Sequence, residues 1–237
     1  MPFLDDTGIR EEIDRGPFWS AFATFGGQLE RMVAVNILWA LQLAPAVLAM
    51  LLIGAPDILR WALIFYTAAA IPPATVVLYA LMRGATDGEP IEFGLIRELL
   101  GKLLIPSYWA FAPLLGSLGF VLWVINTANE AGLQIVSVPL QVGFLFLLTS
   151  ANYWSSLLIE HPEWSAPAIL QLSLKLVWRA PGRSLLVSGA VLLALILGAI
   201  SIGGLVLSVP VIVALLQTQM YLAVTRNPRS VQPDRKA

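Results

Sequence analysis

The sequence contains no cysteine and a single histidine among its 237 residues. Disulfides, iron–sulfur clusters and thiolate zinc sites are therefore excluded, and one imidazole falls short of the two or three that histidine-based metal sites use. Charge is also scarce, because only 12% of the residues are charged, against about 25% in ordinary soluble domains. The net charge of −1 and the lack of a basic, aromatic-rich patch exclude nucleic-acid binding. No cofactor is expected.

Long apolar runs dominate what is present, with 58% hydrophobic residues and a mean hydropathy of +0.79. Such runs predict helices that cross about 30 Å of hydrocarbon. The four clearest spans are Val33–Gly54, Trp61–Met82, Leu103–Ala128 and Leu133–Ile159. The uncharged stretch Ser184–Val224 is too long for one span, and Gly203–Gly204 with Pro210 predicts a turn inside it. Two further spans are therefore expected, at Ser184–Ile202 and Leu205–Val224.

The basic residues favour this six-helix topology. With both termini cytoplasmic, 13 of the 14 Lys and Arg residues lie on the cytoplasmic side, whereas five helices would place five of them outside. No cleavable signal peptide is visible, so the first span is expected to act as the insertion signal. The chain is interpreted as one polytopic membrane domain over residues 1–237. It comprises a cytoplasmic segment 1–32 with an amphipathic helix, a six-helix bundle 33–224 and a cytoplasmic tail 225–237.

An amphipathic segment precedes each odd-numbered span, which indicates a threefold internal repeat. Each even-numbered span also has a proline at the head of its apolar half, and these prolines are Pro72, Pro139 and Pro210. In the third amphipathic segment, residues 164–179, the polar side chains of Gln171, Lys175 and Arg179 fall four apart on one stripe. Such helices lie in the headgroup plane of a bilayer with their apolar face toward the hydrocarbon. The repeating unit is thus predicted to be an interfacial helix followed by a transmembrane hairpin.

Three stretches resemble the YesL-like family of bacterial membrane domains. NILWALQLAPAVLAML (36–51) is similar to its first span, and IPPATVVLYALMRGATDGEPIEFGLIRELLGKLL (71–104) resembles its progression from Pro-Ala through Leu-Tyr to an acidic-glycine turn. YWSSLLIEHPEWSAPAILQLSLKLVWRAPGRSLLV (153–187) resembles its fourth span and the interfacial helix that follows. The resemblance implies a multi-pass protein of the bacterial inner (plasma) membrane without an accepted activity. Family members often accompany carbohydrate ABC importers, which implies an accessory membrane subunit.

Charged side chains are absent from the interior of the expected spans, which weakens a proton-coupled transporter. The polar side chains there are expected to form interhelical hydrogen bonds. The cytoplasmic end of the fourth span holds the strongest candidate cluster, but we favour an aromatic belt of Tyr153, Trp154 and Trp164, with Glu160 and His161 in water. Candidate contacts with a ligand or partner are Asn36, Gln141, Asn152, Trp154, Glu160, His161, Gln171, Lys175, Arg179 and Gln217.

The absence of a Ser-His-Asp order, a glycine-rich phosphate loop or an HExxH helix argues against an enzyme. The favoured hypothesis is a non-enzymatic subunit of another membrane assembly, in contact with lipid and plausible as a partner of a sugar importer. The alternative is a small-solute channel or facilitator, with a polar path lined by Asn36, Gln141, Asn152 and Gln217. A third hypothesis, catalysis on lipid, requires the Glu160–His161 pair to meet in a lipid-accessible cleft.

Overall fold

The computed structural model describes residues 17–52, 54 and 56–225, and these residues form helices without a strand. In chain order the elements are α2 (Pro17–Gly27), α3 (Leu29–Ala40), the short 3₁₀ helix η1 (Leu41–Leu43), α4 (Ala44–Leu51), α5 (Asp57–Thr86), α6 (Phe93–Glu130), α7 (Gln134–Glu160), α8 (Ala166–Arg179), α9 (Pro181–Ile200), α10 (Ile202–Leu207) and α11 (Val209–Thr225). The all-helical class expected from the apolar runs is confirmed.

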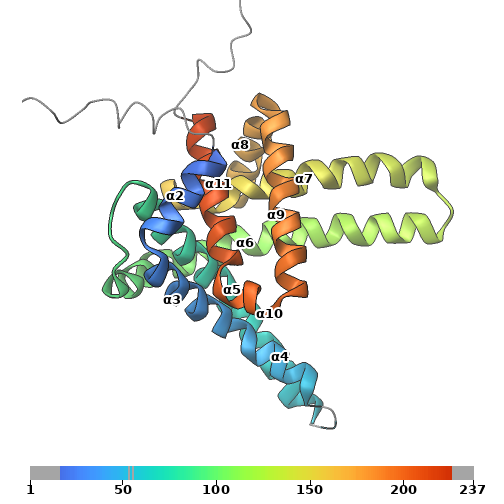
Figure 1. The fold of residues 1–237 in the computed structure, drawn as a ribbon. Helices are drawn as coiled ribbons and strands as arrows, with labels where there is room; N and C mark the ends of the chain where they lie inside the picture. The colour runs from blue at the N-terminus through green and yellow to red at the C-terminus, as the bar shows by residue number, and fades with distance from the viewer. Residues whose placement is uncertain (1–16, 53, 55, 226–237) are drawn as a thin grey trace, which may run out of the picture.

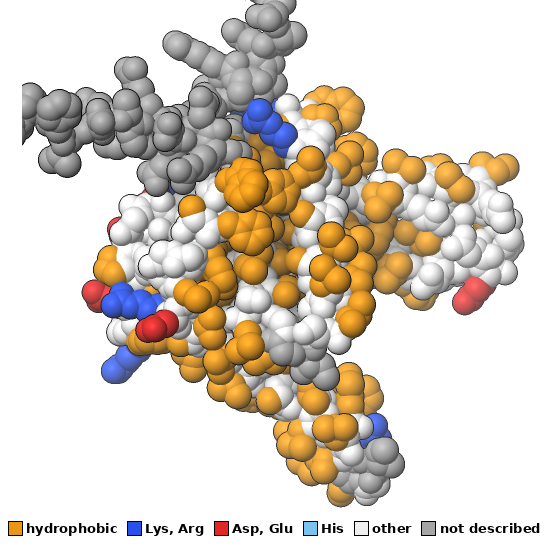
Figure 2. Space-filling view, in the orientation of Figure 1, with side chains coloured by type: hydrophobic (Ala, Val, Ile, Leu, Met, Phe, Trp, Pro, Cys, Tyr) orange, Lys and Arg blue, Asp and Glu red, His pale blue; other side chains and the backbone are white. Residues whose placement is uncertain are grey.

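Five helical segments of the described chain are long and apolar enough to cross a membrane. They are Leu29–Leu51, Asp57–Thr86, Phe93–Glu130, Gln134–Glu160 and Pro181–Gly198. They correspond to the first five expected spans. Large apolar side chains cover much of the visible outer surface (Figure 2), as they do on proteins that face hydrocarbon rather than water. By length and composition, the chain is an α-helical, multi-pass membrane protein.

The sixth expected span is divided in two. The six-residue helix α10 ends before Ser208, and α11 has 17 residues. At 1.5 Å per residue, α11 extends about 26 Å, slightly less than the hydrocarbon core. The sixth span therefore stays a prediction, as does the threefold repeat. Residues 1–16 and 226–237 lie outside the described chain, so the placement of both termini also stays a prediction.

The three expected amphipathic segments differ in how they join the spans. The first is the separate helix α2, and the third is the separate helix α8, which begins at Ala166. The second is not separate, because α6 runs without a break from Phe93 to Glu130. No proline or positive-φ residue stands between Phe93 and Leu103, so nothing interrupts the helical hydrogen bonds there. Residues 93–103 therefore continue directly into the third span.

The hairpins extend in different directions from a common centre (Figure 1). Helices α9 and α11 stand side by side, the α4–α5 hairpin extends away below them, and the hairpin of α6 and α7 projects sideways, across the direction of α9. Gly132 lies in the turn between α6 and α7 with φ of +71°, a backbone conformation that glycine adopts without strain. The hairpins within residues 33–224 are thus splayed in the structure, so their long axes do not share one direction.

Helix α11 joins two apolar clusters at this centre. One cluster surrounds Tyr153, Ile169 and Leu176 and draws on α5, α6, α7, α8, α9 and α11. The other surrounds Met32 and Met82 and draws on α2, α3, α5 and α11. Because both clusters include residues of α5 and α11, these two helices together hold the N-terminal and C-terminal halves of the chain in contact.

Candidate functional site

Four helices meet at a network of buried polar side chains, which we call the interior polar network (Tyr79, Asn152, Ser188 and Gln217). The Tyr79 hydroxyl of α5 donates to Oε1 of Gln217 on α11. Gln217 Nε2 donates to Asn152 Oδ1 on α7 over 2.8 Å. Asn152 Nδ2 in turn donates to Ser188 Oγ on α9 over 2.6 Å. Tyr79, Asn152 and Gln217 are all buried, so the network connects α5, α7, α9 and α11 inside the protein.

The network confirms the expectation of interhelical hydrogen bonds for Asn152 and Gln217. The hydrogen bonds also show which of the four side chains expected to line a channel lie together. Asn36 lies elsewhere, because its Nδ2 donates to the carbonyl oxygen of Val206 over 2.6 Å and its Oδ1 accepts from the Val211 amide over 3.0 Å. Gln141 is exposed on the projecting part of α7. The structure brings Asn152 and Gln217 together and leaves Asn36 and Gln141 apart from them.

Two aromatic side chains beside Asn152 are interior residues. Tyr153 is 0% exposed and shares a 2.7 Å hydrogen bond with Ser184 Oγ on α9. Trp154 is 2% exposed, and its indole N–H donates to Ser150 Oγ over 3.2 Å. The interpretation of these two residues as an aromatic belt is therefore wrong. Helices α8 and α9 cover this end of α7, and their packing removes both rings from the lipid boundary.

Charged groups gather where α5, α7 and α11 end, in what we call the terminal cluster (Arg83, Asp87, Glu160 and Tyr221). Arg83 lies 3.2 Å from a Glu160 oxygen and 3.2 Å from Asp87 Oδ2. The Tyr221 hydroxyl donates to the other Glu160 oxygen. Because the Glu160 side chain is 36% exposed and that of Arg83 is 21% exposed, the cluster sits at the protein surface. It ties the three helix ends together but leaves Glu160 without a free oxygen.

His161 follows Glu160 in the chain but contacts different groups. Its ring stacks on Trp164 at 3.8 Å with an interplanar angle of 4°, and Nδ1 lies 3.7 Å from Glu163. Glu160 and His161 thus have separate partners, and no shared cleft between them is observed among the described residues. Within the same residues, no group of three or more His, Asp or Glu side chains is placed to hold a metal ion.

The polar stripe of α8 is exposed, as the spacing of its residues in the sequence predicts. Gln171, Lys175 and Arg179 are all exposed, and neither cation forms an ion pair with a described residue. The opposite face is not lipid-facing, because Ile169 and Leu176 are buried against the protein core. The expectation that the apolar face of α8 rests on lipid is therefore wrong.

The direction of α8 explains this burial. Its Trp178 ring lies 6.4 Å from the ring of Phe146 on α7. Phe146 is 14 residues before Glu160, which corresponds to about 21 Å along α7. Because α8 starts just after Glu160 and its last turn reaches Phe146, it runs back along α7. Its apolar face therefore packs against a neighbouring helix.

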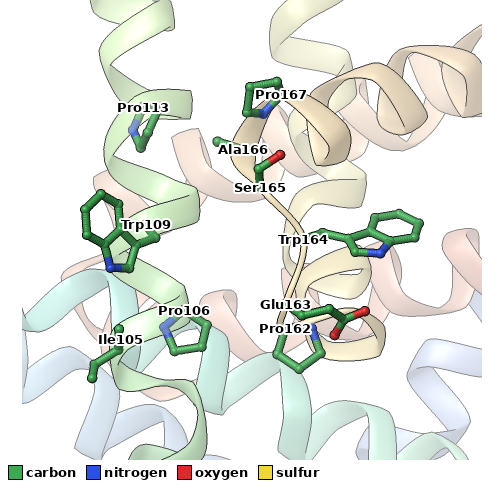
Figure 3. A pocket seen from close by; sticks show the side chains of 10 residues that line it. All are labelled: Ile105, Pro106, Trp109, Pro113, Pro162, Glu163, Trp164, Ser165, Ala166 and Pro167. Carbon is green, nitrogen blue, oxygen red and sulfur yellow. The ribbon is translucent and has the colours of Figure 1, made fainter.

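Cavities also lie among the described residues, away from the polar clusters. One of about 550 Å³ separates α6 from the α7–α8 linker (Figure 3), where Pro106, Trp109 and Pro113 face residues 162–165 of the linker and the first two residues of α8. A polar hollow of about 630 Å³ lies beside residues 26–31. The third, of about 360 Å³, has mostly apolar walls from α3, α5 and α6.

Sequence reasoning missed Tyr79, Ser188 and these cavities. A single Tyr or Ser within an apolar run was the only signal for the two residues. The stripe of Ile96, Leu100 and Leu104, spaced by four on α6, was a signal for the third cavity.

Comparison with protein-family models, with curated proteins and with solved structures finds no match for this chain. The resemblance to the YesL-like family therefore rests on the three quoted stretches of sequence. The function is inferred from the geometry of the described residues.

Proposed function

We propose that this chain is a non-enzymatic, multi-pass subunit of another assembly in the bacterial inner membrane, which it binds through the projecting hairpin. Here "projecting hairpin" means residues 119–145, which lie beyond the last residues of α6 and α7 that pack on the core, Leu118 and Leu147. The observation that carries the proposal is the direction of this hairpin, because it leaves the body sideways and exposes apolar side chains along its length.

The exposed surface of the hairpin is rich in aromatic and branched side chains. Phe120 and Trp123 are each 62% exposed and lie with their rings 6.0 Å apart. Ile135 is 92% exposed and Leu145 is 58% exposed on the returning helix. Aromatic side chains are enriched at the centres of protein interfaces, where they bury large areas at low entropic cost. This surface therefore has the composition of a binding surface as well as that of a lipid-facing one.

The tip of the hairpin favours a protein neighbour over lipid. Glu130 ends α6 and is exposed, and the turn after it adds Gln134. Because the hairpin runs across α9, it does not cross a 30 Å core in the same direction as α9, and its tip would lie in hydrocarbon. An acidic side chain there costs about 2.5–3.5 kcal/mol on insertion scales. Polar groups of a partner would remove this cost.

The terminal cluster supports a cytoplasmic position for the ends of α5, α7 and α11. It gathers charged side chains at one end of these helices, whereas the tip of the α4–α5 hairpin holds only the pair Asp57–Arg60, at 3.7 Å. The α6–α7 hairpin returns to the side from which it started whether or not it crosses the membrane. Both termini are therefore proposed to be cytoplasmic.

The partner that we propose is the membrane part of a carbohydrate ABC importer. The resemblance to the YesL-like family supports this choice, since members of that family often accompany such importers. The interior polar network supports a non-transporting role, because Asn152 and Gln217 bind each other rather than line a path.

Photocrosslinking in native membranes tests the proposal. A photoreactive amino acid at Trp123 should form an adduct with the importer's membrane subunit, identified by mass spectrometry. The matched control position is Leu193 on α9, which is 58% exposed and lies outside the hairpin. We expect the adduct from Trp123 alone. Only lipid adducts at Trp123, or the same protein adduct at both positions, would show that the hairpin is not the binding element.

A further inference from the structure

The third cavity, which we call the three-helix cleft, has hydrocarbon walls from three elements. Leu38 of α3, Val77 and Leu81 of α5, and Leu100 and Leu104 of α6 all line it. The cleft holds about 360 Å³, within the usual range for small-molecule sites. A cleft of this kind in a membrane protein holds an apolar occupant.

The polar groups in the walls are already bonded within the protein. The Trp39 indole N–H donates to Thr75 Oγ1 over 3.1 Å. The Tyr108 hydroxyl donates to the carbonyl oxygen of Ala69, and Gln42 Nε2 donates to that of Leu38 over 3.3 Å. These donors therefore do not require polar partners on an occupant, and recognition inside the cleft is by shape and apolar contact.

The size of the cleft decides between a lipid chain and a helix of another protein. Its lining on α6 runs from Ile96 to Tyr108, which corresponds to about 18 Å along the helix axis. A helix of that length and about 10 Å across occupies about 1,400 Å³. Even the full empty space between the three walls, about 900 Å³ with its open side included, falls short of that volume. A single hydrocarbon chain is narrow enough to enter it.

Just beyond one end of the cleft, Arg31 lines the neighbouring polar hollow. Arg31 precedes Val35, a lining residue, by one turn on the same face of α3. Its Nη1 donates to the Ile91 carbonyl oxygen over 3.1 Å, just before α6 begins. Within the described chain, no carboxylate forms an ion pair with Arg31. A guanidinium in this position has donors left for a phosphate group.

We propose that the three-helix cleft binds one phospholipid, with an acyl chain between α3, α5 and α6 and the phosphate at Arg31. The apolar walls recognise the chain, and the arginine fixes the depth of the headgroup. Bound in this way, the lipid would fill the gap between α3 and the start of α6. This inference does not depend on the proposed partner.

Lipid photolabelling of the full-length protein tests the site. The probe is phosphatidylglycerol with a diazirine midway along one acyl chain, and the comparison probe is diacylglycerol with the same chains. Labelled peptides should map to residues 35–42 and 96–108, and excess unlabelled phosphatidylglycerol should remove this label. Label spread along the apolar surface without enrichment in the cleft would overturn the proposal.

Matched variants separate the cleft from general lipid contact. Ala74→Phe fills the cleft and should abolish labelling there, whereas Ala112→Phe, on an exposed position of α6, should leave it unchanged. Arg31→Gln should weaken labelling by phosphatidylglycerol about fivefold without affecting diacylglycerol, and Arg31→Lys should largely restore it. Equal loss of both probes in Arg31→Gln would assign Arg31 a purely structural role and overturn the headgroup contact. If Ala74→Phe does not fold, the competition measurement on the unmodified chain decides.

Discussion

Gln217→Leu removes the central side chain of the interior polar network while keeping a similar volume. Two interhelical hydrogen bonds are lost, the one from Gln217 Nε2 to Asn152 Oδ1 and the one that Gln217 Oε1 accepts from Tyr79. Tyr79 and Asn152 are 6% and 4% exposed, so water cannot replace the missing partner. The variant therefore leaves a buried hydroxyl and a buried amide oxygen without their partner.

The magnitude follows from these two losses. Interhelical hydrogen bonds in membrane proteins contribute about 0.6 kcal/mol each on average. A buried polar group left without a partner costs about 1–3 kcal/mol. For the two groups together, we therefore expect Gln217→Leu to lower the free energy of unfolding by about 2–6 kcal/mol. The matched control is Gln141→Leu, the same substitution at an exposed position of α7, which should change stability by less than about 0.5 kcal/mol.

Unfolding by sodium dodecyl sulfate in mixed micelles, followed by tryptophan fluorescence, measures the effect. The double variant with Asn152→Leu provides the sharper test, because each single variant leaves the other amide unsatisfied and the double variant does not. The double variant should be about 1–2 kcal/mol more stable than the sum of the two single effects predicts. Additive effects, or equal losses in Gln217→Leu and Gln141→Leu, would refute the assignment of the network as a stabilising link.

Two further experiments test α8 and the topology. Leu176→Glu should destabilise the protein by about 3 kcal/mol or more because it buries a carboxylate in the core. Lys175→Glu with Arg179→Glu, on the exposed stripe, should leave the free energy of unfolding unchanged. Equal losses of stability in the same unfolding assay would contradict the burial of the apolar face of α8. A cysteine at Ser208 should react with an impermeant thiol reagent added outside intact cells. A cysteine at Ser230, which lies beyond the described residues, should not react. The reverse labelling pattern would contradict the cytoplasmic placement of the C-terminal tail.

Helical periodicity predicted the faces of α8 but not what covers them. The four-residue spacing of Gln171, Lys175 and Arg179 correctly placed these side chains on an exposed stripe. The same pattern cannot distinguish lipid from a neighbouring helix under the apolar face, since both are hydrocarbon. This is why the packing of Leu176 against the core became evident only from the structure.

Contacts between distant segments were beyond the reach of sequence reasoning. Asn152 and Gln217 are 65 residues apart, and each is a single polar residue in an apolar run. Runs that are apolar all round carry no pattern that fixes which face meets which neighbour. The directions of the hairpins were unpredictable for the same reason. Tyr153 and Trp154 were consequently assigned to the membrane boundary, although they lie in the core.

The hydrogen bonds of Asn36 have a consequence for the order in which the chain matures. Its side chain forms hydrogen bonds with the backbone on both sides of the break between α10 and α11. The partners are Val206 and Val211, which lie 170 and 175 residues further along the sequence. During synthesis, α3 is therefore made long before the two backbone groups at Val206 and Val211 exist. Until α11 arrives, the early half lacks these two hydrogen bonds and the apolar packing that α11 adds to α2, α3 and α5. A chain truncated before α10 should accordingly be a degradation substrate even though its first helices have already been inserted.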